Sequence, residues 1–399
     1  MDNIKKLQNL CNELHNELTG NIYHYWLENT IDRKYGGFVG RITVDNKRIL
    51  DANKGLVLNA RILWTFSAAF SHFQRDEYLM MAQRAYKYIT ENFFDQKRGG
   101  YYWMLNHKGR PIDKKKQIYG QAFVIYALAE YFDATKDNDA LDDAIRLFAL
   151  IEEFSYDPVH GGYFDALSTN WKKMADTRLS EKDANAPKTM NTHLHILEAY
   201  TRLFQVWQDE RLQKQLTKLI TIHLDKIINP ETGHFDLFFD EAWNCTSDFF
   251  SYGHDIEGAW LMQLAVDTLD DHNLKEPVRE AANRLADITL AEGIAADGGV
   301  MYEGTTEKVI NPERHWWPQA EGMVGFLDAY NATGDQKYLD AVLTIWEFTK
   351  IYIVNPTGEW YWSVDENHNI NPEEDKIGPW KAPYHNSRAC LQLLQRQHC

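Results

Sequence analysis

The chain has 399 residues with 42 basic and 58 acidic side chains, which gives a formal net charge of −16. That excess of negative charge opposes binding to a phosphate backbone and favours a small or neutral partner. No segment approaches the roughly 18 consecutive apolar residues of a membrane span, and the N-terminal segment lacks the apolar core of a signal peptide. We therefore expect no nucleic-acid or membrane partner and a cytoplasmic location.

A short element of glycine and aromatic residues recurs along the whole chain. Its copies read DRKYGGF, DQKRGGYYW, DPVHGGYF, NPETGHF, ADGGVMY and NPTGEWYW. They are marked by Gly37, Gly100, Gly162, Gly233, Gly299 and Gly358, at intervals of 63, 62, 71, 66 and 59 residues. Each copy joins turn-forming residues to aromatic or β-branched ones, which predicts a loop or small hairpin. Six structural repeats therefore fill the chain.

Between these copies lie two helical stretches of different character. Residues 56–73 are apolar on nearly all sides, which is typical of an inner helix, whereas residues 78–93 are amphipathic, as an outer helix is. The later predicted pairs are 119–133 with 140–155, 190–207 with 211–228, 254–270 with 275–291, and 316–331 with 337–352. A last helix, 381–397, and an N-terminal helix, 4–28, each lack a partner.

Pairing these two end helices closes the chain into a ring. The sequence therefore predicts an all-α fold, a single-domain (α/α)6 barrel over residues 1–399, with short Gly-aromatic loops or hairpins between its helix pairs. The alternative is an open solenoid, which would leave the apolar faces of the end helices exposed to solvent.

Polar residues gather near the start of every predicted inner helix, where apolar residues are expected. The clusters are Asn59 and Arg61; Tyr119 and Gln121; Asn191, His193 and His195; His254, Asp255 and Glu257; Trp317, Gln319 and Glu321; and Tyr384, His385, Asn386 and Arg388. Equivalent positions in a closed barrel face one end of its centre. We therefore expect these clusters to converge on one pocket for a small molecule.

Histidines dominate these clusters and limit the chemistry. Histidine accepts and returns a proton near neutral pH, and two histidines on opposite sides of a substrate can invert a carbon by moving its proton. The enediolate formed on the way needs a fixed cationic donor, and Arg61 in LNARILW is the candidate. Arg61 could instead form an ion pair with Glu257 or Glu321. Those two carboxylates also leave a glycoside hydrolase open.

The sequence gives no sign of a metal or cofactor site. His193 and His195 are two residues apart and diverge on a helix, and neither an HExxH motif nor a cysteine cluster accompanies them. The chain also lacks the GxxxxGK[ST] and GxGxxG patterns of nucleotide-binding loops. We therefore expect no bound metal and no cofactor.

Five strings resemble the motifs of one known family. They are NARILWTF (59–66), MNTHLHILEAY (190–200), SYGHDIEGAWL (251–261), RHWWPQAEGMVGF (314–326) and PWKAPYHNSRACL (379–391). In order and over essentially the full chain, they resemble the N-acylglucosamine 2-epimerase family, and most closely its cellobiose 2-epimerase branch. This resemblance implies reversible epimerisation at C2 of the reducing-end sugar of a β-1,4-linked disaccharide such as cellobiose, lactose or mannobiose.

The resemblance also implies roles for single residues. It makes His254 and His385 the acid/base pair and places Arg61 near the enediolate oxygens. Residues expected to hold or polarise the sugar, or to stack on it, are His195, Tyr119, Asp183, Asn191, Glu257, Trp317 and Trp380, and Glu321 completes the expected binding set.

Other activities remain open from the sequence. Within the family these are a mannose aldose-ketose isomerase and an N-acylglucosamine 2-epimerase. From other classes they are an (α/α)6 glycoside hydrolase and a carbohydrate-binding protein without turnover. The expected partner is a disaccharide substrate, and the expected state is a monomer or weak homodimer.

Overall fold

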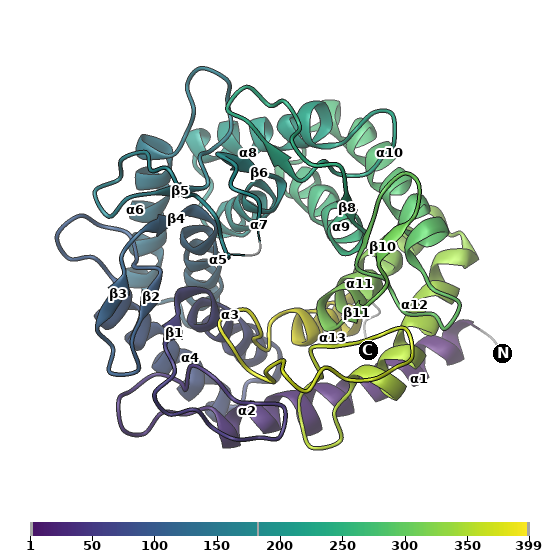
Figure 1. Ribbon diagram of the computed structural model, residues 1–399, viewed down its shortest axis with the longest axis horizontal. Helices are drawn as coiled ribbons and strands as arrows, with labels where there is room; N and C mark the ends of the chain where they lie inside the picture. Colours follow the sequence, from purple (N-terminus) through teal and green to yellow (C-terminus); the bar gives the residue numbers. More distant parts are fainter. Residues whose placement is uncertain (1–2, 182, 397–399) are drawn as a thin grey trace.

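The computed structural model describes residues 3–181 and 183–396, which form a ring of paired helices (Figure 1). The inner helices are α3 (Leu56–Phe73), α5 (Ile118–Thr135), α7 (Met190–Val206), α9 (Tyr252–Leu269), α11 (Trp316–Thr333) and α13 (His385–Arg396). The outer helices are α1 (Asn3–Asn16), α2 (His24–Asn29), α4 (Asp76–Tyr88), α6 (Asn138–Phe154), α8 (Glu210–Ile222), α10 (His272–Ile288) and α12 (Gln336–Phe348). The predicted (α/α)6 barrel is confirmed.

The helix ends differ from the sequence prediction in two ways. Most outer helices finish in a wider π-helical turn, namely Glu17–Tyr23, Ile89–Phe93, His223–Ile227, Thr289–Gly293 and Thr349–Ile353. The last inner helix begins at His385 rather than at residue 381, because Pro379 and Pro383 disfavour helical backbone in the residues before them. Its predicted end at 397 lies outside the described residues. No helix in the described part of the chain has the length and apolarity to cross a membrane.

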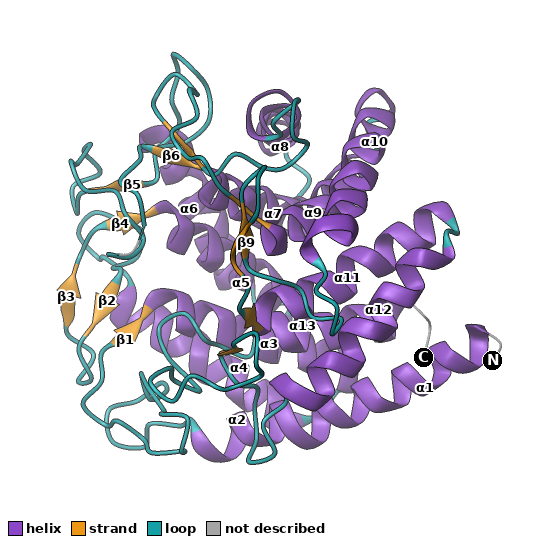
Figure 2. Cartoon of the chain, turned by 45° about the vertical axis from the view of Figure 1, so that its right-hand side comes forward, coloured by secondary structure: helices purple, strands orange, loops and turns teal. Residues whose placement is uncertain are grey.

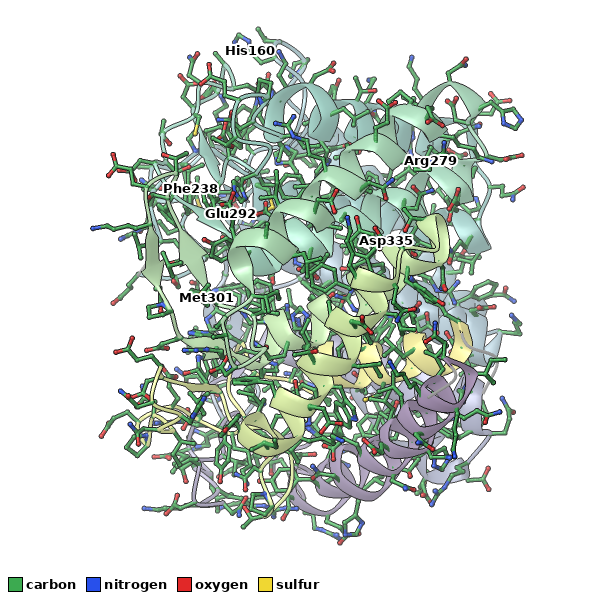
Figure 3. The ribbon with its side chains drawn as sticks, turned by 90° about the vertical axis from the view of Figure 1, so that its right-hand side faces the viewer. His160, Phe238, Arg279, Glu292, Met301 and Asp335 are labelled. Carbon is green, nitrogen blue, oxygen red and sulfur yellow. The ribbon has the colours of Figure 1, made fainter. Side chains whose placement is uncertain are left out.

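Short antiparallel strands gather at one end of the barrel (Figure 2). A strand directly precedes five of the inner helices: β1 (Lys54–Gly55), β4 (Lys116–Gln117), β6 (Lys188–Thr189), β8 (Phe250–Ser251) and β11 (Arg314–His315). They pair, in that order, with β2 (Met104–Leu105), β5 (Ala166–Leu167), β7 (Phe238–Phe239), β9 (Glu303–Gly304) and β12 (Ser363–Val364), and β3 (Pro111–Asp113) and β10 (Val309–Asn311) add outer strands. Phe238 and Met301 mark this end in side view (Figure 3), and the five inner helices that follow a strand start here.

The Gly-aromatic elements form tight loops that the inner helices hold by side chain. Gln121 accepts from the backbone N–H of Tyr101 at 2.8 Å and donates to its carbonyl at 2.9 Å. His193 binds the corresponding loop of the next repeat, where its Nε2 accepts a hydrogen bond from the Tyr163 N–H at 2.9 Å. Glycine is required beside it, because a Cβ on Gly162 would lie 2.7 Å from that nitrogen. The loops are thus fixed to the helices that they precede.

The ring is closed by tryptophan–glutamate hydrogen bonds between its two ends. Trp346 and Trp360 donate from their indole nitrogens to Glu13 at 2.7 Å and to Glu17 at 2.8 Å. A third indole, that of Trp26, donates to Glu359 at 2.6 Å. α1 also packs against α13. The N-terminal helix therefore completes the last repeat, and the open solenoid is excluded.

The loop contact of His193 predicts part of the acid sensitivity of the fold. Burial lowers the pKa of His193 to about 3, so between pH 6.5 and 3 the unfolded chain binds one proton more than the folded chain. Its contribution to stability is complete above pH 6.5 and falls as pH falls through that window. Glutamine serves at the equivalent positions Gln121 and Gln319. We therefore expect His193→Gln to fold. Between pH 7 and pH 5 its free energy of unfolding should fall by about 2 kcal/mol less than that of the wild type.

Urea unfolding of the wild type and of His193→Gln at both pH values measures this difference. Gln83→Asn, on the surface of α4, serves as a control that should follow the wild type. An identical loss of stability in His193→Gln and the wild type would contradict the prediction.

Candidate active site

The polar residues at the inner-helix starts divide into two sets. Gln121, His193, Asp255 and Gln319 turn outward, where each accepts a backbone N–H from a Gly-aromatic loop. The expectation that all the polar residues line one pocket is therefore wrong for these four. The reason is that each loop leaves a buried N–H that needs an acceptor, and the inner helix supplies it. The expectation is also wrong for Asn59 and Asn386, which donate to the Gly55 carbonyl at 2.8 Å and to Glu359 at 2.7 Å.

The other set meets on the barrel axis. We call it the axial cluster, and it comprises Arg61, Tyr119, His195, Glu198, His254, Glu257, Trp317, Glu321, Trp380, Tyr384, His385 and Arg388. His254 and Trp380 are half-buried, whereas the other members are buried. Access to the cluster therefore lies on the side of His254 and Trp380.

Arg388 lies at the centre of the buried part of the cluster. Its Nη2 donates to Glu257 at 2.8 Å and to Glu321 at 2.6 Å, and its Nη1 donates to Glu198. Its guanidinium also stacks on Tyr384, with the centroid 4.3 Å away. One side chain of α13 thus connects carboxylates from α7, α9 and α11.

These carboxylates differ in their protonation. Burial alone raises the pKa of each group, but at Glu321 and Glu198 the charge of Arg388 and the hydrogen bond from a histidine outweigh it and lower the pKa. At Glu257, burial and the charge of Glu321 outweigh Arg388, and the pKa is well above its usual range. Glu198 and Glu321 are therefore ionised at neutral pH, and Glu257 is the carboxyl group of the three that most readily keeps a proton.

Two histidines are oriented by these ionised carboxylates. Nδ1 of His385 lies 2.6 Å from Glu321, and Nδ1 of His195 lies 2.9 Å from Glu198. An ionised carboxylate only accepts, so in both rings Nδ1 carries the hydrogen and Nε2 keeps a free lone pair. Burial lowers the pKa of both histidines, that of His385 to about 3. Both are neutral at pH 7, the state in which histidine can take up a proton.

His254 is arranged differently. Its Nδ1 is buried and has no partner among the described residues, so no protein group fixes its tautomer. Burial, followed by the nearby His195 and His385, lowers its pKa to about 3. The indole of Trp317 lies 4.7 Å from the His254 ring and 5.8 Å from the His385 ring, centroid to centroid. The two predicted acid/base residues thus flank one aromatic surface.

Arg61 reaches the cluster from α3. It donates to the Tyr119 hydroxyl and to the Trp380 carbonyl, both at 2.9 Å, and its guanidinium lies 4.5 Å from the Phe123 ring centroid. It forms no ion pair within the described part of the chain, because Arg388 engages Glu257 and Glu321 instead. The ion-pair alternative for Arg61 is therefore wrong. Its charge remains unneutralised beside the histidines, as an oxyanion partner requires.

Two predicted binding residues lie outside the hydrogen-bonded cluster. Asn191, in the first turn of α7, is half-buried, and its Oδ1 is buried without a partner among the described residues. Asp183 lies in the loop before α7 and accepts from the backbone N–H of Ser180 at 2.8 Å. Burial, followed by the charge of Asp183, raises the pKa of Glu303 in β9 to about 7. The Asp183 charge also acts on Tyr119, so Asp183 lies near both the strand-bearing end and the axial cluster.

The arrangement does not favour a metal ion. Glu257, Glu321 and His385 have ligand atoms within 4.8 Å of one another, the one such group found in the described part of the chain. Arg388, however, already donates to both carboxylates, and Glu321 is bonded to His385. A divalent cation would have to displace the guanidinium.

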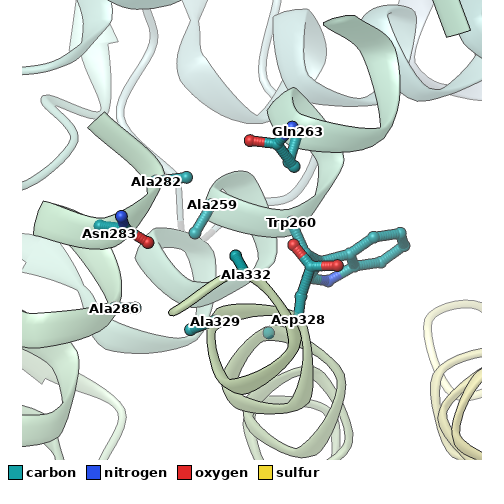
Figure 4. Close-up of a pocket in the computed structure, with 10 residues that line it drawn as sticks. Ala259, Trp260, Gln263, Ala282, Asn283, Ala286, Asp328, Ala329 and Ala332 are labelled. Carbon is teal, nitrogen blue, oxygen red and sulfur yellow. The ribbon is translucent and has the colours of Figure 1, made fainter. Parts of the chain in front are cut away.

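A small cavity lies elsewhere, between α9, α10 and α11 (Figure 4). Its volume is about 10 Å³, which is the space of a single water molecule, and alanines make up much of its lining. It is too small for a sugar. The axial cluster is the candidate active site, because it brings together histidines oriented by carboxylates and an arginine without an ion-pair partner among the described residues.

Sequence reasoning missed Glu198 and gave Arg388 no role. Glu198 lies in the third turn of α7, beyond the helix starts where the polar clusters were sought. A signal was present, because Glu198 follows His195 by three residues and so shares its helix face. Arg388 similarly follows His385 by three residues.

These features are typical of an enzyme that moves protons on a polar organic substrate. The family model for N-acylglucosamine 2-epimerase (GlcNAc 2-epimerase) matches residues 36–389. The chain belongs to this family of epimerases.

Its relatives cover nearly the whole chain. It is 46% identical to a cellobiose 2-epimerase of Bacteroides fragilis over 96% of this chain and 98% of that protein. A D-mannose isomerase of Marinomonas mediterranea is 27% identical, over 90% of this chain and 91% of the relative. The solved structure of cellobiose 2-epimerase from Bacillus thermoamylovorans superposes with a TM-score of 0.93 at 38% identity, covering 98% of this chain and 100% of that one.

Proposed function

We propose that this enzyme interconverts the C2 epimers of the reducing-end sugar of a β-1,4-linked disaccharide, with cellobiose and glucosyl-mannose as one pair. The observation that carries the proposal is the pair of neutral histidines, His254 and His385, which both lie beside the indole of Trp317. The names of the relatives with 46% and 38% identity support the disaccharide. Lactose and mannobiose offer the same reducing-end chemistry. We further propose a cytoplasmic enzyme with one catalytic domain.

The reaction begins with the open-chain sugar, whose C1 aldehyde makes the C2 proton acidic. One histidine removes this proton, and Arg61 stabilises the enediolate by a charge-assisted hydrogen bond. The C2–C3 bond then rotates, and the other histidine returns a proton to the opposite face. His195, Tyr119, Asn191 and Asp183 hold the sugar by hydrogen bonds. The axial cluster supplies these steps from its own side chains without a metal or cofactor.

The buried carboxylates speak against a glycoside hydrolase. Glu257 and Glu321 are 1% and 0% exposed, and both accept from the same nitrogen of Arg388. A hydrolase needs its acid and its nucleophile or base beside the scissile bond. Here Glu321 instead orients His385, which favours proton transfer at carbon.

NMR of the EDTA-treated protein with cellobiose in D2O tests the proposal. We expect glucosyl-mannose with deuterium at C2. A ketose product would identify the enzyme as an aldose-ketose isomerase, and free glucose would identify it as a hydrolase. Exchange seen with N-acetylmannosamine alone would identify it as an N-acylglucosamine 2-epimerase. An unchanged spectrum with every sugar would leave only a carbohydrate-binding protein.

Trp380 offers a test of the disaccharide preference. Its half-buried indole lies 5.8 Å from Trp103 and 6.0 Å from Tyr119, centroid to centroid, so it can stack on a sugar ring. We expect Trp380→Ala to raise KM for cellobiose by about fivefold, because one stacking contact is worth about 1 kcal/mol. The Trp380 carbonyl still holds Arg61 in this variant, so kcat should change little. An equal change in KM for mannose would contradict a role at the second sugar.

A further inference from the structure

The buried charges around Arg388 do not balance unless a proton is retained. Arg388 is 0% exposed and contacts Glu198, Glu257 and Glu321, each at most 3% exposed. With all three ionised, one guanidinium would face three negative charges. Arg61 adds a second positive charge but forms no ion pair with them. Net charge is costly to bury, so one carboxyl group must stay protonated.

The hydrogen bonds identify which group keeps the proton. Glu198 accepts from His195 and Glu321 accepts from His385, in addition to Arg388. Within the described residues, Glu257 accepts from Arg388 alone. An acceptor with more donors is more stable when ionised. Glu257 is therefore the protonated member, which agrees with its raised pKa.

We propose that Arg388 is a positioning residue that keeps Glu198 and Glu321 ionised, fixes through them the Nδ1–H tautomers of His195 and His385, and leaves the proton on Glu257. The proposal rests on the proposed epimerase function and adds to it the device that makes the histidines bases. Arg388 itself touches no reacting atom, because its guanidinium is enclosed by the three carboxylates, Tyr384 and Trp260.

The titration of His385 depends on charges from several helices. Besides burial, the groups that act on it are Glu321 of α11, Arg61 of α3 and Arg388 of its own helix α13, and the charges of His254 and His385 affect each other. Glu198 of α7 and Glu257 of α9 contact Arg388. Loss of the Glu321 charge lowers the pKa of His385, and Arg388→Gln should act in the same way, because Glu321 takes up a proton when the Arg388 charge is removed. The two neutral variants therefore act in the same direction.

The test is the pH profile of kcat/KM on cellobiose for Arg388→Gln and Glu321→Gln. We expect both to lose about 100-fold or more in kcat at pH 7, since the base loses its fixed tautomer. The acid limbs of both profiles should move to lower pH, by about one pH unit in Glu321→Gln. Arg388→Lys keeps the charge and should keep the wild-type acid limb. Arg396→Gln, on the same helix, is the control for losing an arginine that binds Asp328.

Two spectroscopic readouts need neither activity nor the substrate. The 15N shifts of labelled histidine rings should report Nδ1–H for His385 in the wild type and lose this signature in Glu321→Gln. Infrared spectra should show a protonated-carboxyl C=O band that disappears in Glu257→Gln. A uniform loss of activity at all pH values, an unchanged tautomer, or the absence of that band would overturn the proposal. If the wild type does not epimerise cellobiose while the band and tautomer are present, only the proposed function fails.

Should Arg388→Gln not fold, as circular dichroism would show, Arg388→Lys and Glu321→Gln still decide the question. An acid limb that stays in place in Arg388→Lys and moves to lower pH in Glu321→Gln supports the charge mechanism. Equal profiles for both variants contradict it.

Discussion

His254→Asn and His385→Asn are each expected to lower kcat for epimerisation by about 1,000-fold, within the range for loss of a general acid or base. Yet each variant should still exchange the C2 hydrogen of one epimer with solvent deuterium. The remaining histidine can remove the proton from the face that it contacts and return a deuteron to that same face. The two variants should therefore exchange opposite epimers.

Incubation of each variant with cellobiose and, separately, with glucosyl-mannose in D2O measures this directly by NMR. Asparagine at position 385 can still donate to Glu321, so the buried network keeps its shape. His160→Asn is the control, since that side chain is exposed on a loop (Figure 3) and its loss should leave both reactions unchanged. Exchange of the same epimer by both variants would contradict a two-base mechanism and point to one base acting on both faces.

The fold was predictable because its signals are local. Turn residues such as Gly37 and Gly100 mark each repeat, and an apolar stretch such as 56–73 differs from its amphipathic partner over a few helical turns. The π-helical ends were not predictable from such patterns, since the widened turn has no distinct residue signature here. The predicted start of the last inner helix, residue 381, was too early, because the prediction followed the helical periodicity and did not let Pro383 delay the helix start.

The candidate site was only partly predictable, because side-chain direction depends on the neighbouring repeat. Gln121 and Tyr119 are two residues apart on one helix, yet one holds a loop and the other faces the axis. The sequence alone does not distinguish these two directions, because they depend on which buried backbone N–H needs an acceptor. Arg388 and Glu198 were hidden for the related reason that they are 190 positions apart in sequence and meet only when the ring closes.

Arg61→Ala is expected to lower kcat by about 100- to 1,000-fold and to change KM by less than about threefold. Loss of a fixed donor to a developing oxyanion typically lowers kcat by that factor. The neutral aldehyde of the bound sugar interacts only weakly with the arginine charge, so KM should change little. Arg61 is already held by the Tyr119 hydroxyl and the Trp380 carbonyl, so it need not reorganise during the reaction. Steady-state kinetics on cellobiose separates kcat from KM.

Arg61→Lys distinguishes charge from geometry at the same position. A lysine keeps the positive charge, but its single ammonium group lacks the planar fork that reaches both partners. We expect it to recover about 10-fold of the lost kcat, and Tyr119→Phe to lose part of kcat by freeing one arm of Arg61. Arg202→Lys is the matched control, because Arg202 also lies on an inner helix but pairs with Glu130 and Asp133. A rise in KM with unchanged kcat in Arg61→Ala would mean that this arginine only binds the sugar, and that the enediolate charge is stabilised elsewhere in the axial cluster.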